Sequence, residues 1–240
     1  MYKLLKINNI HYIIRLEVKN MEINKNRLPK RKPKKTFRSV TGYFPSKKNG
    51  RSMFFESMLE KTLFITLEFD DNVLTYLEQP VKIEYEFNNR KRSYHPDCLV
   101  NYKNRKSKLI EVKYSTELVE KKDELEIKFD QAKKYAKEND LIFDIFDENR
   151  INIQTLRNME FLYSFSTHPS DSEKEQMIIN ILKTNHELIV SEVLNLITEN
   201  RFDQAKYLPF IWKLVFENKI KIDYENIKID MNSLIRLNDE

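Results

Sequence analysis

YHPDCLVNYKNRKSKLIEVKYS, residues 94–115, reads as two short strands joined by a polar turn at residues 103–107. Successive side chains of a strand point to opposite faces, so Glu111 and Lys113 are expected on the same face. If the two strands pair about the turn, Asp97 lies across from them, within the reach of cross-strand neighbours. The stretch therefore predicts two carboxylates and one ammonium group on one surface of a sheet.

Clustered carboxylates beside a lysine suit the metal-dependent hydrolysis of phosphodiesters. Mg²⁺ takes oxygen ligands from one or two carboxylates, water and substrate phosphate, and a lysine can orient the attacking water. The order Pro96, Asp97, then Glu111, any residue and Lys113 is the PD-(D/E)xK pattern of metal-dependent nucleases. Because 33% of the residues are charged, Glu-x-Lys also arises by chance, and a solvated strand face is the alternative on this stretch alone.

Composition limits the class of protein. A chain of 240 residues holds one large domain or two modest ones, and its net charge is +5. The single cysteine, Cys98, excludes an intramolecular disulfide framework and a cysteine-based zinc site, and the four histidines show no ligand spacing. The sequence has no run of membrane-spanning length and no apolar core of a secretory signal. We therefore expect a soluble cytoplasmic protein without membrane contact.

Basic residues gather near the N-terminus. Between residues 25 and 38 the charge has one sign, and Pro29 and Pro33 prevent a helix. Such a segment cannot fold alone and attracts DNA by counterion release, although a solvated linker is the alternative. Beyond it, Gly42 and Gly50 predict loops. The candidate DNA-binding residues are Lys30, Arg31, Lys32, Lys34, Lys35, Arg38, Lys47, Lys48 and Arg51.

Apolar periodicity predicts a small α/β domain with a mixed central sheet. A helix is expected over residues 53–69, capped by Ser52, with Glu56 and Glu60 one turn apart. Two acids on a charged helix are ordinarily solvent-facing. The other expected elements are a connector at 73–80, a half-exposed strand at 81–87, a helix at 116–137, a buried strand at 141–146 and a helix at 151–163.

A second unit is expected after a linker at residues 167–171. Its predicted elements are helices at about 172–182, 188–199 and 203–218 and two strands joined at Glu225 and Asn226, which is the order of a winged helix. The third helix has few residues that could read bases: Gln204, Lys206 and Lys213. Contact with a protein partner or with the DNA backbone is therefore favoured over sequence-specific reading, and a packing module without a ligand is the alternative.

Four blocks of the sequence resemble, in order, the TnsA endonuclease subunits of heteromeric transposases. They are GRSMFFESMLEKTLFITLEFD (50–70), EQP (78–80), YHPDCLV (94–100) and LIEVKYS (109–115), and the similarity covers most of residues 36–160. It implies a restriction-endonuclease-like core with a mixed central sheet, followed here by a winged-helix-like α+β domain. The domains expected are a basic N-terminal extension at 1–37, a nuclease domain at 38–164 and a C-terminal domain at 171–240.

The resemblance also implies roles for residues. Glu60 matches the metal-binding glutamate of the helix, with Glu56 one turn away as the alternative. Asp97 matches the metal-binding aspartate, and Glu111 falls where some members have glutamine. Lys113 matches the catalytic lysine, and the carbonyl of Val112 is a further expected metal ligand. Two accessory candidates resemble the Q-x-x-x-Y helix of related nucleases: Gln131 and Tyr135.

The implied activity is that of an Mg²⁺-dependent endodeoxyribonuclease, with two ions per site and Mn²⁺ able to substitute. It hydrolyses the non-transferred strand at transposon ends, together with a DDE transposase and an AAA+ ATPase regulator. Two alternatives are a stand-alone restriction or repair nuclease of the same fold and a non-catalytic DNA-binding adaptor.

Overall fold

The computed structural model describes residues 40–238. The predicted basic extension at 1–37 and its candidate DNA-binding residues therefore lie outside the described residues, as does Arg38. Residues Thr36–Glu240 group as a single unit. None of the described helices is long and apolar enough to cross a membrane.

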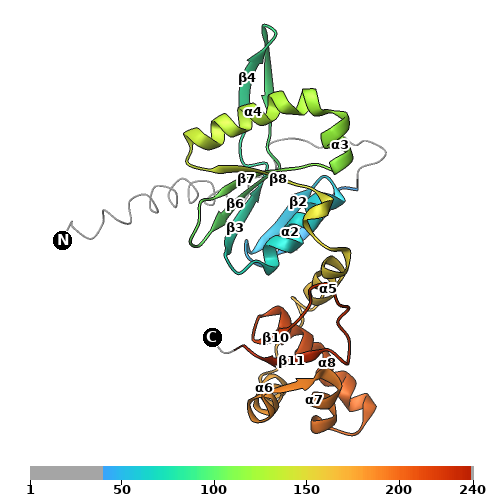
Figure 1. Cartoon of the computed structure of the whole chain (residues 1–240). Coiled ribbons are helices and arrows are strands. Elements are labelled where there is room, and N and C mark those ends of the chain that lie inside the picture. Colours follow the sequence, from blue (N-terminus) through green and yellow to red (C-terminus); the bar gives the residue numbers. More distant parts are fainter. Residues whose placement is uncertain (1–39, 239–240) are drawn as a thin grey trace, which may run out of the picture. The chain divides into compact units, whose positions relative to one another are not determined.

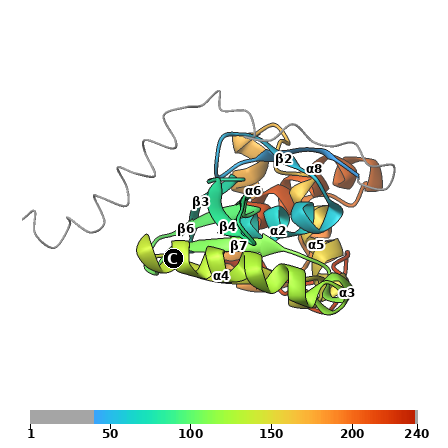
Figure 2. The same cartoon turned by 90° about the horizontal axis from the view of Figure 1, so that it is seen from above.

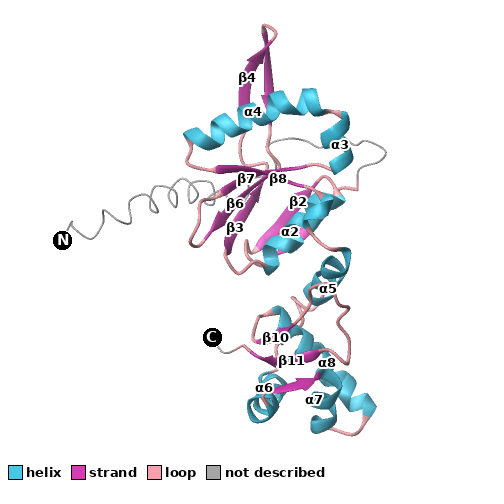
Figure 3. Cartoon of the chain, in the orientation of Figure 1, coloured by secondary structure: helices cyan, strands magenta, loops and turns pink. Residues whose placement is uncertain are grey.

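The central sheet has four strands in the order β3-β6-β7-β8 (Figure 3). Its strands are β3 (Val73–Glu78), β6 (Cys98–Tyr102), β7 (Lys108–Val112) and β8 (Ile142–Phe146). The first three pair antiparallel, whereas β7 and β8 run parallel. The mixed central sheet expected from the sequence is thus confirmed, and the stretch at 94–115 supplies its two inner strands.

Helices cover both faces of this sheet (Figures 1 and 2). One face packs against α2 (Met58–Phe69), whose Leu63 and Phe64 share a core with Ile110 and Val112. The other face packs against α4 (Lys122–Glu138), where Phe129 meets Phe143 of β8 with ring centroids 5.5 Å apart. Because side chains alternate along a strand, Glu111 points to the α4 side while its neighbours on β7 point to α2.

Two hairpins form separate two-stranded sheets. The first pairs β1 (Gly42–Ser46) with β2 (Arg51–Phe55), and the second pairs β4 (Ile83–Phe87) with β5 (Arg90–Tyr94). The expectation of a helix from residue 53 was wrong, because residues 51–55 pair with β1 and the helix begins after Ser57, whose side chain caps it. Ser52 is not its cap.

Three further expectations are corrected. The connector expected at 73–80 contains β3, an edge strand of the central sheet. Gly42 lies inside β1, where a Cβ would approach the Phe55 ring to 2.6 Å, so only Gly50 serves a loop, with φ of +62°. The long helix divides at Lys121, with φ of −110°, into α3 (Ser115–Glu120) and α4.

The predicted buried strand at 141–146 is β8, but it is an edge strand and only half-buried. A short 3₁₀ helix (Glu148–Arg150) then leads into α5 (Ile153–Tyr163). Asn158 of α5 is buried and donates hydrogen bonds to the carbonyls of Tyr224 and Ile227, at 2.8 and 2.6 Å. The C-terminal loop is therefore tied to α5.

The C-terminal elements form a three-stranded antiparallel sheet with three helices. In chain order they are α6 (Ser172–Asn185), β9 (Glu187–Ile189), α7 (Val190–Ile197), α8 (Arg201–Phe216), β10 (Ile220–Ile222) and β11 (Leu234–Leu237). Strand β9 was not predicted from the sequence, because its three residues are too few to show a period. The last strand was predicted too early, since residues 223–233 form the loop held by Asn158 and the strand follows at 234.

Candidate functional site

Asp97 lies just before β6, beside the end of β7. The backbone N–H of Val112 donates a hydrogen bond of 2.7 Å to its Oδ2 atom. Its own carbonyl accepts from the backbone N–H of Gln79 at 2.9 Å. Asp97 is thus fixed between the ends of β3 and β7, which is the cross-strand position predicted from the turn.

Glu111 is buried at 3% exposure, and both its carboxylate oxygens are bonded. The hydroxyl of Tyr94 donates to Oε2 at 2.5 Å, and the ammonium of Lys113 lies 2.7 Å from Oε1. Burial, followed by the negative charge of Asp97, raises the pKa of Glu111 to about 8. A buried carboxylate with such a shift is the kind of group found at functional sites.

The ammonium of Lys113 gathers three oxygen atoms from different groups. It lies 2.7 Å from Glu111, 3.4 Å from Asp97 Oδ2, and it donates to the carbonyl of Val112 at 2.8 Å. Burial opposes the charged form of the amine, but Asp97 and Glu111 outweigh it and raise the pKa of Lys113 above its ordinary value. The structure therefore brings together four of the predicted groups: Asp97, Glu111, Lys113 and the Val112 carbonyl.

Glu60 stands at the start of α2, and its carboxylate turns back onto the helix N-terminus. It accepts hydrogen bonds from the backbone N–H of Glu56 at 2.9 Å and from the hydroxyl of Ser57 at 3.0 Å. Burial, and then the charge of Asp97, raises the pKa of Glu60 to about 7. Glu60 thus belongs to the same electrostatic cluster as Asp97, while its hydrogen bonds to Glu56 and Ser57 are those of a capping residue.

Of the accessory candidates, Glu56 lies just before α2, and Gln131 and Tyr135 lie on α4. Glu56 precedes the Ser57 cap, and its Oε1 atom is buried without a hydrogen-bond partner in the described structure. Gln131 and Tyr135 lie half-buried on α4, one turn apart as expected.

Of the basic candidates within the described residues, Lys47 is exposed and two others are bonded inside the protein. Lys48 donates to the carbonyls of Asp70 and Val73 at the end of α2. Arg51 makes a two-pronged contact with the buried Glu78, at 2.8 and 2.5 Å. Lys213, considered for base reading, is only 4% exposed and bound to Glu175, so it is not available for that role.

Sequence reasoning missed two residues beside the cluster. In the sequence, Tyr94 is only the first residue of the motif stretch. Its hydrogen bond to Glu111 depends on the β4–β5 register, which places Tyr94 at the root of that hairpin. Gln79 has a φ of +43°, which is uncommon outside glycine, and it is 9% exposed. The EQP block was the only signal for Gln79.

The oxygen donors of the cluster fit a hard divalent cation. Two carboxylates and one backbone carbonyl already surround a single positive charge, and Mg²⁺ takes such oxygens together with water and phosphate. Within residues 40–238 there is no ready-made group of three or more acidic, histidine or cysteine side chains for a metal. A third carboxylate, Glu60, is near enough for the charge of Asp97 to help raise its pKa, after burial.

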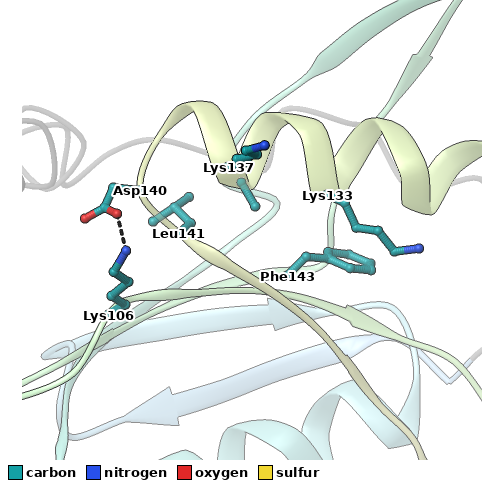
Figure 4. Close-up of a pocket in the computed structure, with 7 residues that line it drawn as sticks. Lys106, Lys133, Lys137, Asp140, Leu141 and Phe143 are labelled. Carbon is teal, nitrogen blue, oxygen red and sulfur yellow. Dashed lines mark hydrogen bonds and ion pairs between the residues drawn. The ribbon is translucent and has the colours of Figure 1, made fainter.

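A pocket of about 370 Å³ lies elsewhere, lined by Lys106, Lys133, Ala136, Lys137, Asp140, Leu141 and Phe143 (Figure 4). In it Lys106 is paired with Asp140. The pocket lies where β7 begins, whereas Glu111 and Lys113 lie where β7 ends. It is therefore separate from the carboxylate cluster.

Comparison with known families gives two consecutive matches. Residues 70–148 match the family described as TnsA-like endonuclease N terminal, and residues 150–224 match TnsA endonuclease C terminal. The first match contains Asp97, Glu111 and Lys113 but begins after Glu60. A search of curated proteins gave no match.

Proposed function

The chain belongs to the TnsA-like endonuclease family, and from that premise we propose that it is an Mg²⁺-dependent endodeoxyribonuclease of Tn7-type transposition. In this proposal it hydrolyses the non-transferred strand at the ends of the element. The observation that carries the proposal is the meeting of Asp97, Glu111 and the Val112 carbonyl around the ammonium of Lys113.

Each group of the cluster has a proposed task. Asp97, Glu111 and the Val112 carbonyl would hold the divalent cation, with Glu60 joining from α2; two ions per site and exchange of Mg²⁺ for Mn²⁺ are part of the proposal. Once bound, the cation supplies positive charge to the attacked phosphate and acidifies water.

Lys113 would orient the attacking water or neutralise charge on the phosphate. Its ammonium is already held beside both carboxylates. Tyr94 keeps the Glu111 carboxylate in one orientation through its hydroxyl. Three accessory residues are proposed to contact the metal site or the DNA bound there: Glu56, Gln131 and Tyr135.

We also propose a winged-helix-like role for the C-terminal elements. Support comes from the order helix, strand, two helices and two strands, with the three strands in one antiparallel sheet. Because Lys213 is buried and Trp212 and Leu214 belong to the core, α8 offers little for base reading. The expected partners are the DDE transposase, the AAA+ ATPase regulator and the DNA backbone.

The test compares variants of the cluster with variants of another lysine–aspartate ion pair of the central sheet, between β7 and β8. Asp97→Ala and Lys113→Ala are expected to abolish Mg²⁺-dependent cleavage of a plasmid carrying the transposon ends, with and without the cognate transposase. Lys108→Ala and Asp144→Ala remove the 2.6 Å ion pair at the other end of β7 and should keep cleavage.

Circular dichroism and thermal melting would verify that all four variants fold. Wild-type rates from folded Asp97→Ala and Lys113→Ala proteins would refute the assignment. Cleavage of DNA lacking transposon ends, without the transposase, would instead point to a stand-alone nuclease.

A further inference from the structure

The β4–β5 hairpin extends away from the central sheet, past α4 (Figure 1). Only the pair at its root, Ile83 and Tyr94, is buried. At its tip, Asn88 and Asn89 have φ values of +51° and +56°, as a tight two-residue hairpin turn requires. A two-stranded ribbon that buries so little surface contributes little to the core, so a contact outside the core is the natural reason for its length.

The two faces of this hairpin differ in charge. Opposite residues share a face, so the pairs Tyr85–Arg92 and Phe87–Arg90 lie on one side. That side carries two arginines and two aromatic rings and no acid. The other side carries two glutamates, Glu84 and Glu86, together with Lys82 and Lys91.

The two arginines are free to bind an outside partner. Both are exposed, and within residues 40–238 no carboxylate lies at ion-pair distance from either. Glu124 on α4 is paired with Lys128 at 2.7 Å. This pairing lowers the pKa of Glu124 more than the charge of Arg92 does. The guanidinium of Arg92 lies 5.5 Å from the centre of the Phe87 ring, which restrains its flexible side chain.

The arginine face leads directly to the carboxylate cluster. Along β5, Arg90, Arg92 and Tyr94 point the same way, and the hydroxyl of Tyr94 reaches Glu111. Arg92 is two residues from Tyr94 along the strand, a distance of ~7 Å, and Arg90 is four residues away, at ~14 Å. At ~3.4 Å of helix axis per nucleotide, these distances correspond to about two and four nucleotides.

We propose that the Arg90–Arg92 face of the β4–β5 hairpin binds the phosphate backbone of duplex DNA beside the bond to be cut. Arginine matches phosphate with a planar fork of donors, and the groove of duplex DNA admits a two-stranded ribbon. The proposal rests on the proposed nuclease function, because it assigns the place of the substrate at that same site.

The test compares variants of the two faces of the hairpin. Each variant removes two positive charges from one face. The full-length chain would be titrated onto a fluorescein-labelled 30-base-pair duplex of arbitrary sequence, a length of ~100 Å of helix axis. Fluorescence anisotropy would be measured in EDTA, to prevent cleavage, from low to moderate KCl. The variants are Arg90→Ala/Arg92→Ala and, as the matched control, Lys82→Ala/Lys91→Ala.

The arginine variant is expected to bind roughly tenfold or more weakly and to flatten the slope of log K against log salt by about 1.8, or 0.9 for each lost phosphate contact. The control should keep both the affinity and the slope within error. Arg90→Lys/Arg92→Lys should restore most of the slope, because the charges return. Melting curves would confirm that the hairpin variants fold.

Equal weakening by the two alanine pairs, no weakening by the arginine pair, or a wild-type chain that does not bind the duplex would each overturn the proposal. The result is separable from the nuclease assignment. A wild-type chain that binds DNA through the arginines but never cuts with metal and transposase would contradict the nuclease function and leave the DNA-binding face intact.

Discussion

At the scale of single residues, the proposed site depends on the orientation of the Glu111 carboxylate. One of its oxygens faces Lys113 and the other accepts from Tyr94, so its orientation is fixed from both sides. Groups that orient a metal ligand commonly change metal affinity by 10- to 100-fold, an order of magnitude or two, when removed. In the proposed site, Tyr94 would therefore act through Glu111, as a positioning residue.

Tyr94→Phe is expected to weaken Mn²⁺ binding about tenfold and to slow cleavage, because Glu111 loses its fixed orientation. The Tyr94 hydrogen bond also opposes the raised pKa of Glu111, so its loss should move the rise of activity to higher pH. Isothermal titration and a pH–rate profile would measure both effects. Tyr43→Phe, on the exposed surface of β1, is the control and should change neither.

The sequence predicted those residues of the candidate site whose positions follow from strand alternation and from strand pairing about a turn. Strand alternation placed Glu111 and Lys113 on one face, and the turn brought Asp97 across from them. Tyr94 could not be found in this way, because its contact depends on which residues pair in the neighbouring hairpin. The turn of the Glu60 carboxylate onto its own helix cap also depends on where that helix begins, which the sequence analysis misplaced.

At the scale of elements, a buried carboxylate explains why residues 51–55 form a strand. Glu68 of α2 accepts from the hydroxyls of Ser46 and Tyr76, at 2.6 and 2.7 Å, and from the backbone N–H groups of Lys47 and Lys48. These bonds fix the β1–β2 turn from a helix that follows later in the chain. The apolar run 53–55 has no periodicity of its own, so long-range contacts such as these, together with the pairing to β1, decide between strand and helix.

Glu68→Ala is expected to destabilise the protein by about 2–4 kcal/mol, since four donors lose their acceptor and two of them are buried hydroxyls. Urea unfolding followed by circular dichroism would measure the change. Glu86→Ala on the exposed hairpin removes the same charge and should stay within about 0.5 kcal/mol of wild type.

A buried lysine links two helices of the C-terminal elements, α6 and α8. Lys213 of α8 lies 2.7 Å from Glu175 of α6 and donates to the hydroxyl of Ser170 at 2.8 Å. Lys213→Ala is expected to cost about 2–4 kcal/mol in urea unfolding, because Glu175 is left largely buried with only the longer contact to Lys219, at 3.9 Å. Lys206→Ala, which breaks only an exposed ion pair on the same helix, should cost less than about 1 kcal/mol.

At the scale of the whole molecule, the two shifted carboxyls tie stability to pH. Glu60 and Glu111 have pKa values raised from 4.5 to about 7 and about 8, so the folded chain holds protons that the unfolded chain has released. Their stabilising contribution is complete below pH 4.5 and is lost as the pH rises to about 8. In EDTA, the unfolding free energy is therefore expected to fall across this window.

Urea unfolding at pH 5, 6, 7 and 8 would measure that fall, and Glu60→Gln/Glu111→Gln should flatten it, because neutral amides do not titrate. A double variant with the same pH dependence as wild type would contradict the assignment of the shifts to these two groups. Added Mg²⁺ should stabilise the wild-type chain most at pH 8, where the carboxylates are ionised.

The position of the Lys113 ammonium also determines how the negative charges of Asp97 and Glu111 are balanced when no metal is bound. Two acids placed this close would repel each other, yet the strand that presents one of them also presents a cation of its own two residues later. The chain therefore carries its own counter-ion for the two acids. In the proposed nuclease site, an arriving Mg²⁺ would share or displace that amine, so metal binding would compete with the Lys113 ammonium.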